Sequence, residues 1–183
     1  MIRNELYLRG VVISIAFLHL ALISPVGSEP DRIQSTLEEI EKIHSEGKYS
    51  STIAVLEKLQ YLRPYHDKIS IRYAVALIYR EDSVREEDYI EGCKTAAQIL
   101  QGVIDLHAGN IAPGSRGEIA VIHFYRGLAL WFSDQMNSAL EEFHISYKMD
   151  PELREAVYNQ AAILHELQKY RESQSMMELY LKL

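Results

Sequence analysis

The sequence predicts an all-α fold: a right-handed α-solenoid of about four helix-turn-helix units, the second of them enlarged. From Glu29 onward, apolar residues recur at spacings of three and four, and no run alternates as a half-buried strand would. Few Gly or Pro residues interrupt these periodic segments. With 183 residues, 48% of them hydrophobic and 25% charged, the chain can bury one ordinary core. We therefore expect a single helical repeat domain over residues 29–183.

Residues 1–28 differ in character from the rest of the chain. A segment with two arginines precedes the apolar run GVVISIAFLHLALI, and SPVGS follows it. A basic start, an apolar centre and small residues before the cut define a secretory signal peptide, and Val26 and Ser28 fit the last requirement. The apolar run is shorter than the roughly 20 residues of a membrane-spanning helix. We predict a signal peptide cleaved before Glu29, with an uncleaved anchor and a buried cytosolic helix as successive alternatives.

Charge and cysteine content restrict the location and the partners. The only cysteine, Cys93, lies far from the predicted cut, so it provides neither a lipid-anchor site nor an internal disulfide. The mature chain is therefore expected to be exported, periplasmic or secreted, without a stable membrane span. The net charge of −7 provides no basic field for a nucleic-acid backbone, so nucleic acid is excluded as an expected partner.

Eight helices are predicted, and several of their ends have a recognisable signal. Gly47 supplies the first turn. Ser115 and Glu118 have the spacing of a capping box, and Asp150 followed by Pro151 has the pattern of an N-cap and first helical residue. The Gly- and Pro-rich stretch at residues 108–117, between the fourth and fifth predicted helices, is expected to be a connecting loop. The predicted helices cover about 31–46, 49–62, 67–80, 86–107, 116–133, 135–149, 151–167 and 170–182.

A period of 34 residues relates the last two helix pairs. Similar residues stand 34 positions apart at Gly127 and Ala161, Leu130 and Leu164, Ala139 and Ser173, and Phe143 and Met177. Units starting near residues 33 and 67 have the same spacing. The next clear start is near residue 120, so the second unit contains 53 residues instead of 34. One helix pair cannot bury its apolar face alone, so the units are expected to stack.

The third unit resembles the tetratricopeptide repeat (TPR) family, whose helix-turn-helix unit combines small, aromatic and proline positions. The matching residues are Gly127, Met136, Ala139, Phe143 and Pro151. The first unit is similar through EGKY, Leu56, Leu59 and Pro64, and the fourth through Ala161, Tyr170 and Ser173. The resemblance implies that the first helix of each unit lines a concave groove, which holds a peptide or a helix of a partner protein.

This alignment places an apolar and aromatic set of side chains in the implied groove. Aromatic side chains clustered in a concavity supply much of the energy of protein binding. Alternatively, the segment FYRGLALWF is buried on both faces, because the solenoid is tightly curled or the 108–117 loop covers it. The expected partner-binding residues are Ile71, Val75, Ile78, Tyr79, Phe124, Leu128, Trp131, Phe132 and Tyr158.

No motif predicts catalysis, a metal site or a cofactor. His123, His144 and His165 are 21 residues apart, which is not the i, i+4 spacing of a zinc-binding helix. No Gly-x-Ser-x-Gly sequence marks a nucleophile. We therefore expect a non-enzymatic protein, and a metal-dependent or hydrolytic enzyme is the least favoured class.

The sequence thus favours an adaptor or scaffold that binds another protein through a concave apolar groove, in envelope assembly, secretion or chaperoning. The alternative is a structural, self-assembling subunit whose aromatic face is buried. The last helix, YRESQSMMELYLKL, places Met177, Tyr180 and Leu181 on one face without a following polar cap. A homodimer through this C-terminal helix would cover that face.

Overall fold

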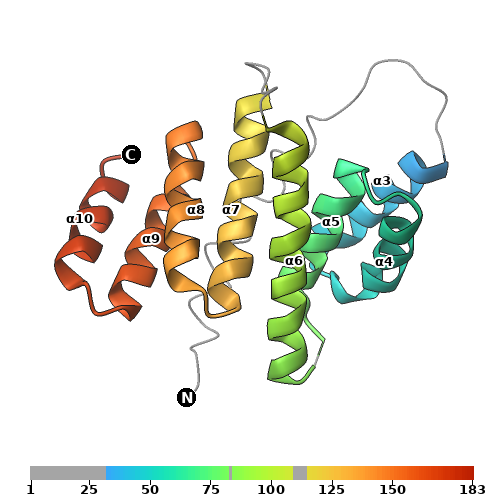
Figure 1. The fold of residues 1–183 in the computed structure, drawn as a ribbon, viewed down its shortest axis with the longest axis horizontal. Coiled ribbons are helices and arrows are strands. Elements are labelled where there is room, and N and C mark those ends of the chain that lie inside the picture. Colours follow the sequence, from blue (N-terminus) through green and yellow to red (C-terminus); the bar gives the residue numbers. More distant parts are fainter. Residues whose placement is uncertain (1–31, 83, 109–114) are drawn as a thin grey trace.

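The computed structural model describes residues 32–82, 84–108 and 115–183, and the predicted signal peptide at 1–28 lies outside them. Within these ranges the chain forms α-helices and one short 3-10 helix, without a strand (Figure 1). This confirms the predicted all-α class. The elements are α3 (Arg32–Ser45), η2 (Ser50–Thr52), α4 (Ile53–Leu62), α5 (Asp67–Ile78), α6 (Glu86–His107), α7 (Arg116–Phe132), α8 (Met136–Met149), α9 (Arg154–Glu166) and α10 (Tyr170–Tyr180).

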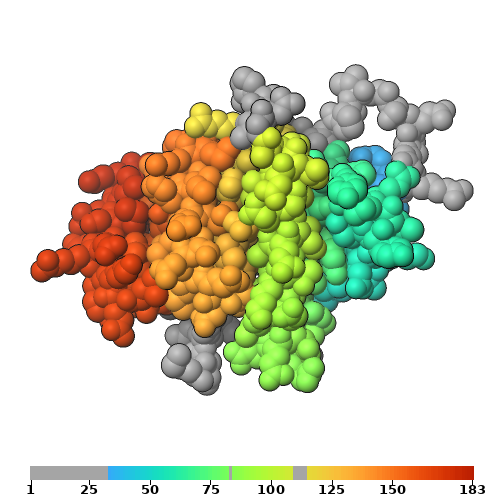
Figure 2. Space-filling view, in the orientation of Figure 1, coloured from blue at the N-terminus to red at the C-terminus, as the bar shows by residue number. Residues whose placement is uncertain are grey.

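The helices form four consecutive pairs that follow one another along the long axis of the molecule, from unit 1 at the right of Figure 1 to unit 4 at the left. From α4 to α10, each helix packs against the next one along the chain, and α5 also contacts α7. Figure 2 shows α6 and α8, the second helices of their pairs, at the front of the molecule. Contacts confined to neighbours define a solenoid, as the sequence predicts.

The turns inside three of the units share one backbone geometry. Each has a residue with positive φ: 73° at Gly47, 68° at Asp134 and 59° at Gln168. In each turn the next backbone N–H donates to the carbonyl five residues earlier, which is the pattern of a Schellman helix end. These bonds run from Lys48 to Ile43 (3.3 Å), from Gln135 to Leu130 (2.8 Å) and from Lys169 to Leu164 (2.8 Å). Asp134 and Gln168 are 34 residues apart, so the backbone repeats with the predicted period.

A close approach between α7 and α8 depends on the absence of a side chain at Gly127. A Cβ atom there would lie 2.8 Å from Cε1 of Phe143, whose ring is fully buried. Ala139, one turn earlier on α8, is also fully buried. The small and aromatic repeat positions therefore set the distance between the two helices.

The second unit is enlarged by its connection and its second helix. α6 has 22 residues, the longest of the described helices. The connection is held to unit 1 by Ser50, whose hydroxyl lies 2.8 Å from Oδ1 of Asp82 and accepts a hydrogen bond from the N–H of Glu81 at 3.0 Å. The guanidinium of Arg80 pairs with Asp82 at 2.6 Å. The described start of this connection, from Arg80 to Asp82, is therefore anchored to unit 1.

Two predicted helix starts are corrected by the structure. Ser115 precedes α7, but its side chain makes no capping bond, since its φ of −95° and ψ of 2° are not the extended geometry of a capping residue. Asp150 and Pro151 form a turn before α9, which begins at Arg154. In this turn a carboxylate oxygen of Asp150 accepts from the N–H of Glu152 at 3.0 Å. The aspartate therefore closes a local turn instead of capping the helix.

Replacing Gly127 by Ala tests the close packing of α7 on α8. The added methyl group meets the Phe143 ring at 2.8 Å, so overpacking of about 1–3 kcal/mol outweighs a gain of roughly 1 kcal/mol in helix propensity. We expect urea unfolding to show a net loss of stability. Gly102→Ala on α6 is the matched control, because no atom lies within 4 Å of its added Cβ. That control should gain about 0.5–1 kcal/mol; equal effects of both substitutions would contradict the packing.

Candidate functional site: the first helices α5, α7 and α9

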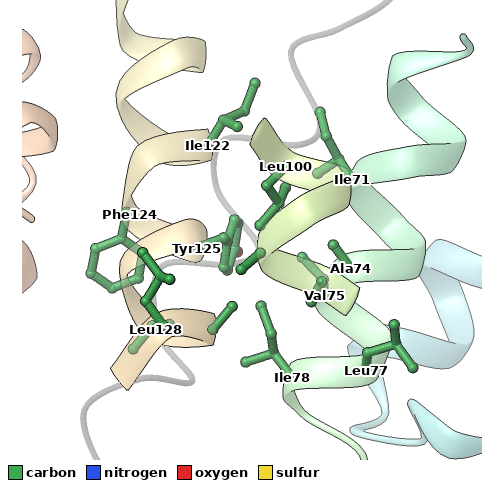
Figure 3. Close-up of a cluster of buried hydrophobic side chains, with 14 of the residues drawn as sticks. Ile71, Ala74, Val75, Leu77, Ile78, Leu100, Ile122, Phe124, Tyr125 and Leu128 are labelled. Carbon is green, nitrogen blue, oxygen red and sulfur yellow. The ribbon is translucent and has the colours of Figure 1, made fainter. Parts of the chain in front are cut away.

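The nine predicted partner-binding residues lie on the first helices of three units. Ile71, Val75 and Ile78 follow the three- and four-residue spacing of one helix face, and so do Phe124, Leu128 and Trp131 on α7. Figure 3 shows Val75 of α5 and Tyr125 of α7 beside Leu100 of α6, whereas Phe124 and Leu128 lie on the other side of α7. Tyr79 is the C-cap residue of α5, Phe132 is the last residue of α7, and Tyr158 lies on α9.

Most of these side chains are part of the hydrophobic core. The three half-buried members of the set are Tyr79, Phe132 and Tyr158. The other six belong to one continuous cluster of buried residues, with Trp131 the most exposed among them at 9%. In this structure the six face other core residues, which matches the predicted alternative of a buried aromatic face. Binding of a partner by any of the nine stays a prediction. The six core positions are Ile71, Val75, Ile78, Phe124, Leu128 and Trp131.

A chain of ring contacts connects the first three units. Neighbouring rings of this kind stabilise by about 0.5–1.5 kcal/mol per pair beyond their buried area. Burial raises the pKa of the hydroxyl groups of Tyr79 and Tyr125, so both remain neutral at physiological pH. The chain joins His44 to Tyr49 (centroids 4.8 Å apart), Tyr49 to Tyr79 (5.4 Å), Tyr79 to Tyr125 (6.3 Å), Tyr125 to Phe124 (5.8 Å) and Phe124 to Phe143 (5.5 Å).

His44 begins this chain and is a buried neutral base. Its Nε2 lies 2.8 Å from the hydroxyl of Thr52, which itself donates to the carbonyl of Tyr49 at 2.8 Å. The hydroxyl has only one hydrogen, so the Nε2–H of His44 is the donor to Thr52. Burial, followed by the charge of Arg72, lowers the pKa of His44 from 6.5 to about 4, with Glu81 acting weakly in the opposite direction.

A buried polar cluster joins α7 to α8. The carboxylate of Glu142 lies 2.7 Å from Nδ1 of His123 and also accepts a hydrogen bond from the guanidinium of Arg126. Removing Arg126 would leave the buried carboxylate of Glu142 without its cationic partner, and breaking a buried ion pair in this way typically costs about 3–5 kcal/mol. This arrangement positions two helices. Among the described residues, no group of three or more His, Cys, Asp or Glu side chains could hold a metal ion.

The two other histidines of the predicted series are not brought to this cluster. His144 lies exposed on α8, and His165 lies exposed near the end of α9. The ring of His165 contacts that of Tyr170, with centroids 5.3 Å apart. The three histidines of the 21-residue series therefore do not share a site.

The structure also exposes apolar residues that the sequence analysis did not select. Tyr61 and Tyr65, at the end of α4 and in the following turn, are 85% and 80% exposed. Leu181, which the sequence analysis did place on the apolar face of the last helix, is 74% exposed just after α10. A signal for the first group was present in the sequence: Pro64 stands between the two tyrosines and marks a turn at the surface. None of the helices in the described ranges has the length and apolar character needed to cross a membrane.

Comparison with known proteins identifies the fold. No protein-family model and no curated protein sequence matches the chain. A solved structure, "MamA RS-1 ArsTM double mutant", is similar with a TM-score of 0.63 and 17% sequence identity, over 84% of this chain and 76% of that one. MamA contains TPR units. At this identity the similarity shows the fold alone, which is a TPR-like stack of helix pairs.

The neutral state of His44 predicts a pH dependence of stability. A histidine whose pKa is lower in the folded than in the unfolded state stabilises the fold while neutral, so its contribution is complete above pH 6.5. The contribution is lost as the pH falls from 6.5 toward 4, with a slope of up to about 1.4 kcal/mol per pH unit. We expect His44→Gln to reduce this slope in denaturant titrations, whereas His144→Gln, at an exposed position, keeps it. Identical slopes in all three proteins would show that His44 is not the titrating group.

Proposed function

We propose that this chain is a member of the TPR family that acts as a protein-interaction scaffold and holds a peptide or helix of a partner protein. The observation that carries the proposal is the TPR-like stack of four helix pairs, a fold shared with a TPR-containing protein. Such a stack offers long helix faces at fixed spacing, which suits the binding of an extended or helical segment. The proposed role is non-enzymatic.

Burial limits where a partner would contact the first helices. The stripes of α5 and α7 lie largely in the core. That of α9 is partly covered by α10, since the ring of Tyr158 contacts Tyr180 and that of His165 contacts Tyr170. It still retains some access, because Tyr158 and Ala162 are half-buried and His165 is exposed. These three residues are spaced by four and three, so they share one face of α9. Phe132, half-buried at the end of α7, stacks on the core residue Trp131 with ring centroids 6.0 Å apart. The Phe132 ring also lies 6.3 Å from that of Tyr89 on α6. We therefore place the partner segment along α9 alone.

A specific observation favours self-association as the second candidate. None of the residues of α10, the last of the described helices, is buried. Tyr170 and Leu181 are 58% and 74% exposed, and Met177 is half-buried. A homodimer through this C-terminal helix would cover these side chains with the same surface of a second copy.

We further propose that the protein is exported and works in envelope assembly, secretion or chaperoning. The support is the signal-peptide pattern of residues 1–28. N-terminal sequencing of the protein recovered from its host tests the proposal. A chain that begins at Glu29 is expected, and one that begins at Met1 and remains in the cytosol would contradict export.

Site-specific photocrosslinking tests the scaffold proposal in the full-length chain. A photoreactive residue at position 165 on α9 is expected to capture a defined partner protein, because this side chain is exposed on the proposed partner-binding face of α9. The matched control is position 144, an exposed histidine on α8. Equal capture at both positions, or none at 165, would contradict binding along α9.

The mass of the full-length chain in solution tests the second candidate, self-association through α10. If α10 forms a homodimer, Leu181→Glu should convert a dimer to a monomer in mass measurements in solution. Ile145→Glu, at an exposed apolar position on α8, is the control and should leave the mass unchanged. A wild-type chain that is monomeric at micromolar concentration would contradict self-association.

A further inference from the structure

An exposed aromatic patch lies where α4 ends and the turn to α5 begins. It consists of Tyr61, Leu62 and Tyr65, which are 85%, 59% and 80% exposed, and we name it the α4–α5 patch. Tyr61 and Tyr65 are the two most exposed large hydrophobic residues in the described chain. Side chains exposed to this degree project from the surface and do not line a groove.

The turn that carries the patch is braced from both sides. The N–H of Arg63 donates to the carbonyl of Leu59 at 2.8 Å and so ends α4. The side-chain amide of Gln60 donates to the carbonyl of Pro64 at 3.3 Å, and its oxygen accepts from the hydroxyl of Ser70 on α5 at 2.9 Å. The patch is therefore held in a defined position on the scaffold.

A further apolar residue is brought to the same end of the molecule. Asp67, the first residue of α5, pairs with His107, the last residue of α6, at 2.7 Å. Figure 1 shows α5 beginning and α6 ending at the upper end of the molecule. Leu106, next to His107, is 54% exposed there. An exposed apolar residue of unit 2 therefore lies at the same end of the molecule as the α4–α5 patch.

The charge around the patch differs from that of the whole chain. Residues 58–66, KLQYLRPYH, include Lys58 and Arg63 and no acidic residue, although the chain has a net charge of −7. Both basic residues are exposed. The neighbouring carboxylates are Glu57, one turn before Tyr61, then Asp67, which pairs with His107, and Asp105, which accepts from Gln101 at 2.6 Å. The patch therefore joins aromatic and aliphatic side chains with positive charge.

We infer that the α4–α5 patch docks this protein on the surface of an anionic lipid bilayer. Tyrosine has an apolar ring and a polar tip, which suits the headgroup level of a membrane, and Leu62 can enter the acyl boundary. Lys58 and Arg63 would attract anionic headgroups while their stems remain in apolar contact. This docking requires no helix that spans the membrane.

A lipid surface fits the geometry better than a partner protein does. Binding hot spots on proteins are typically enclosed in well-packed, desolvated pockets, whereas these tyrosines protrude. A soft headgroup layer accommodates protruding side chains without a complementary pocket. Docking at this end leaves the α9 face, in unit 4, free for the proposed partner, so the inference is independent of the scaffold proposal.

A local reporter tests contact with the bilayer in the full-length chain. Leu62→Cys is labelled with an environment-sensitive dye at pH 7, at which Cys93 stays unreactive because burial raises the pKa of its thiol to about 11. With vesicles of phosphatidylcholine and phosphatidylserine, the dye emission should shift to the blue and be quenched by spin-labelled lipid. Ile145→Cys on α8 carries the control dye, which should show neither change. The protein should bind vesicles of pure phosphatidylcholine more weakly than vesicles that contain phosphatidylserine.

Replacing the basic residues by neutral ones tests the electrostatic contribution to lipid binding. Lys58→Gln with Arg63→Gln should weaken binding to the anionic vesicles by about 30-fold, or about 5-fold for each cation removed. Lys148→Gln with Arg171→Gln, at exposed positions on α8 and α10, should leave binding unchanged.

A dye at position 62 that does not respond to vesicles would overturn membrane docking and assign the patch to a protein contact. Equal responses at positions 62 and 145 would overturn it as well, because another part of the chain would then bind the lipid.

Discussion

The stack depends on the burial of the first-helix stripes between neighbouring units. Ile71 and Val75 of α5 and Leu128 of α7 lie in one cluster with Leu100 of α6, so no unit buries its own apolar face without the next. The bare backbone of Gly127 lets the Phe143 ring reach α7 and sets the spacing within unit 3. The same stripes that hold the units together are the ones that would otherwise form an open groove.

The burial of the first-helix stripes determines which apolar side chains remain exposed for binding. Where two neighbouring units cover a first helix, its aromatic side chains are used for stability, as with Phe124. At the ends of the stack the cover is incomplete, so Tyr158 on α9 and Tyr61 on α4 retain exposed surface. The proposed partner site therefore lies near one end of the described stack, and the proposed lipid contact lies near the other.

Much of the fold follows from local sequence patterns, and the exposure of the candidate site does not. The spacing of apolar residues predicts the helix spans and the 34-residue period. Gly47 marks a turn whose backbone geometry recurs at Asp134 and Gln168. The burial of Trp131 depends instead on how closely separate units approach, which a repeat pattern does not encode. The sequence pattern also predicts the start of α9 at Pro151 instead of Arg154, because it does not show that Asp150 accepts from the N–H of Glu152 within a turn.

The fluorescence of Trp131, the only tryptophan, tests the central claim that the aromatic stripe of α7 is core. Its ring stacks on Phe132, and its indole N–H donates to the carboxylate of Glu166 at 3.3 Å. The structure predicts a blue emission that acrylamide quenches weakly in the native protein, even at dilutions at which it is monomeric. A red, readily quenched emission under these conditions would show an open groove and contradict the account.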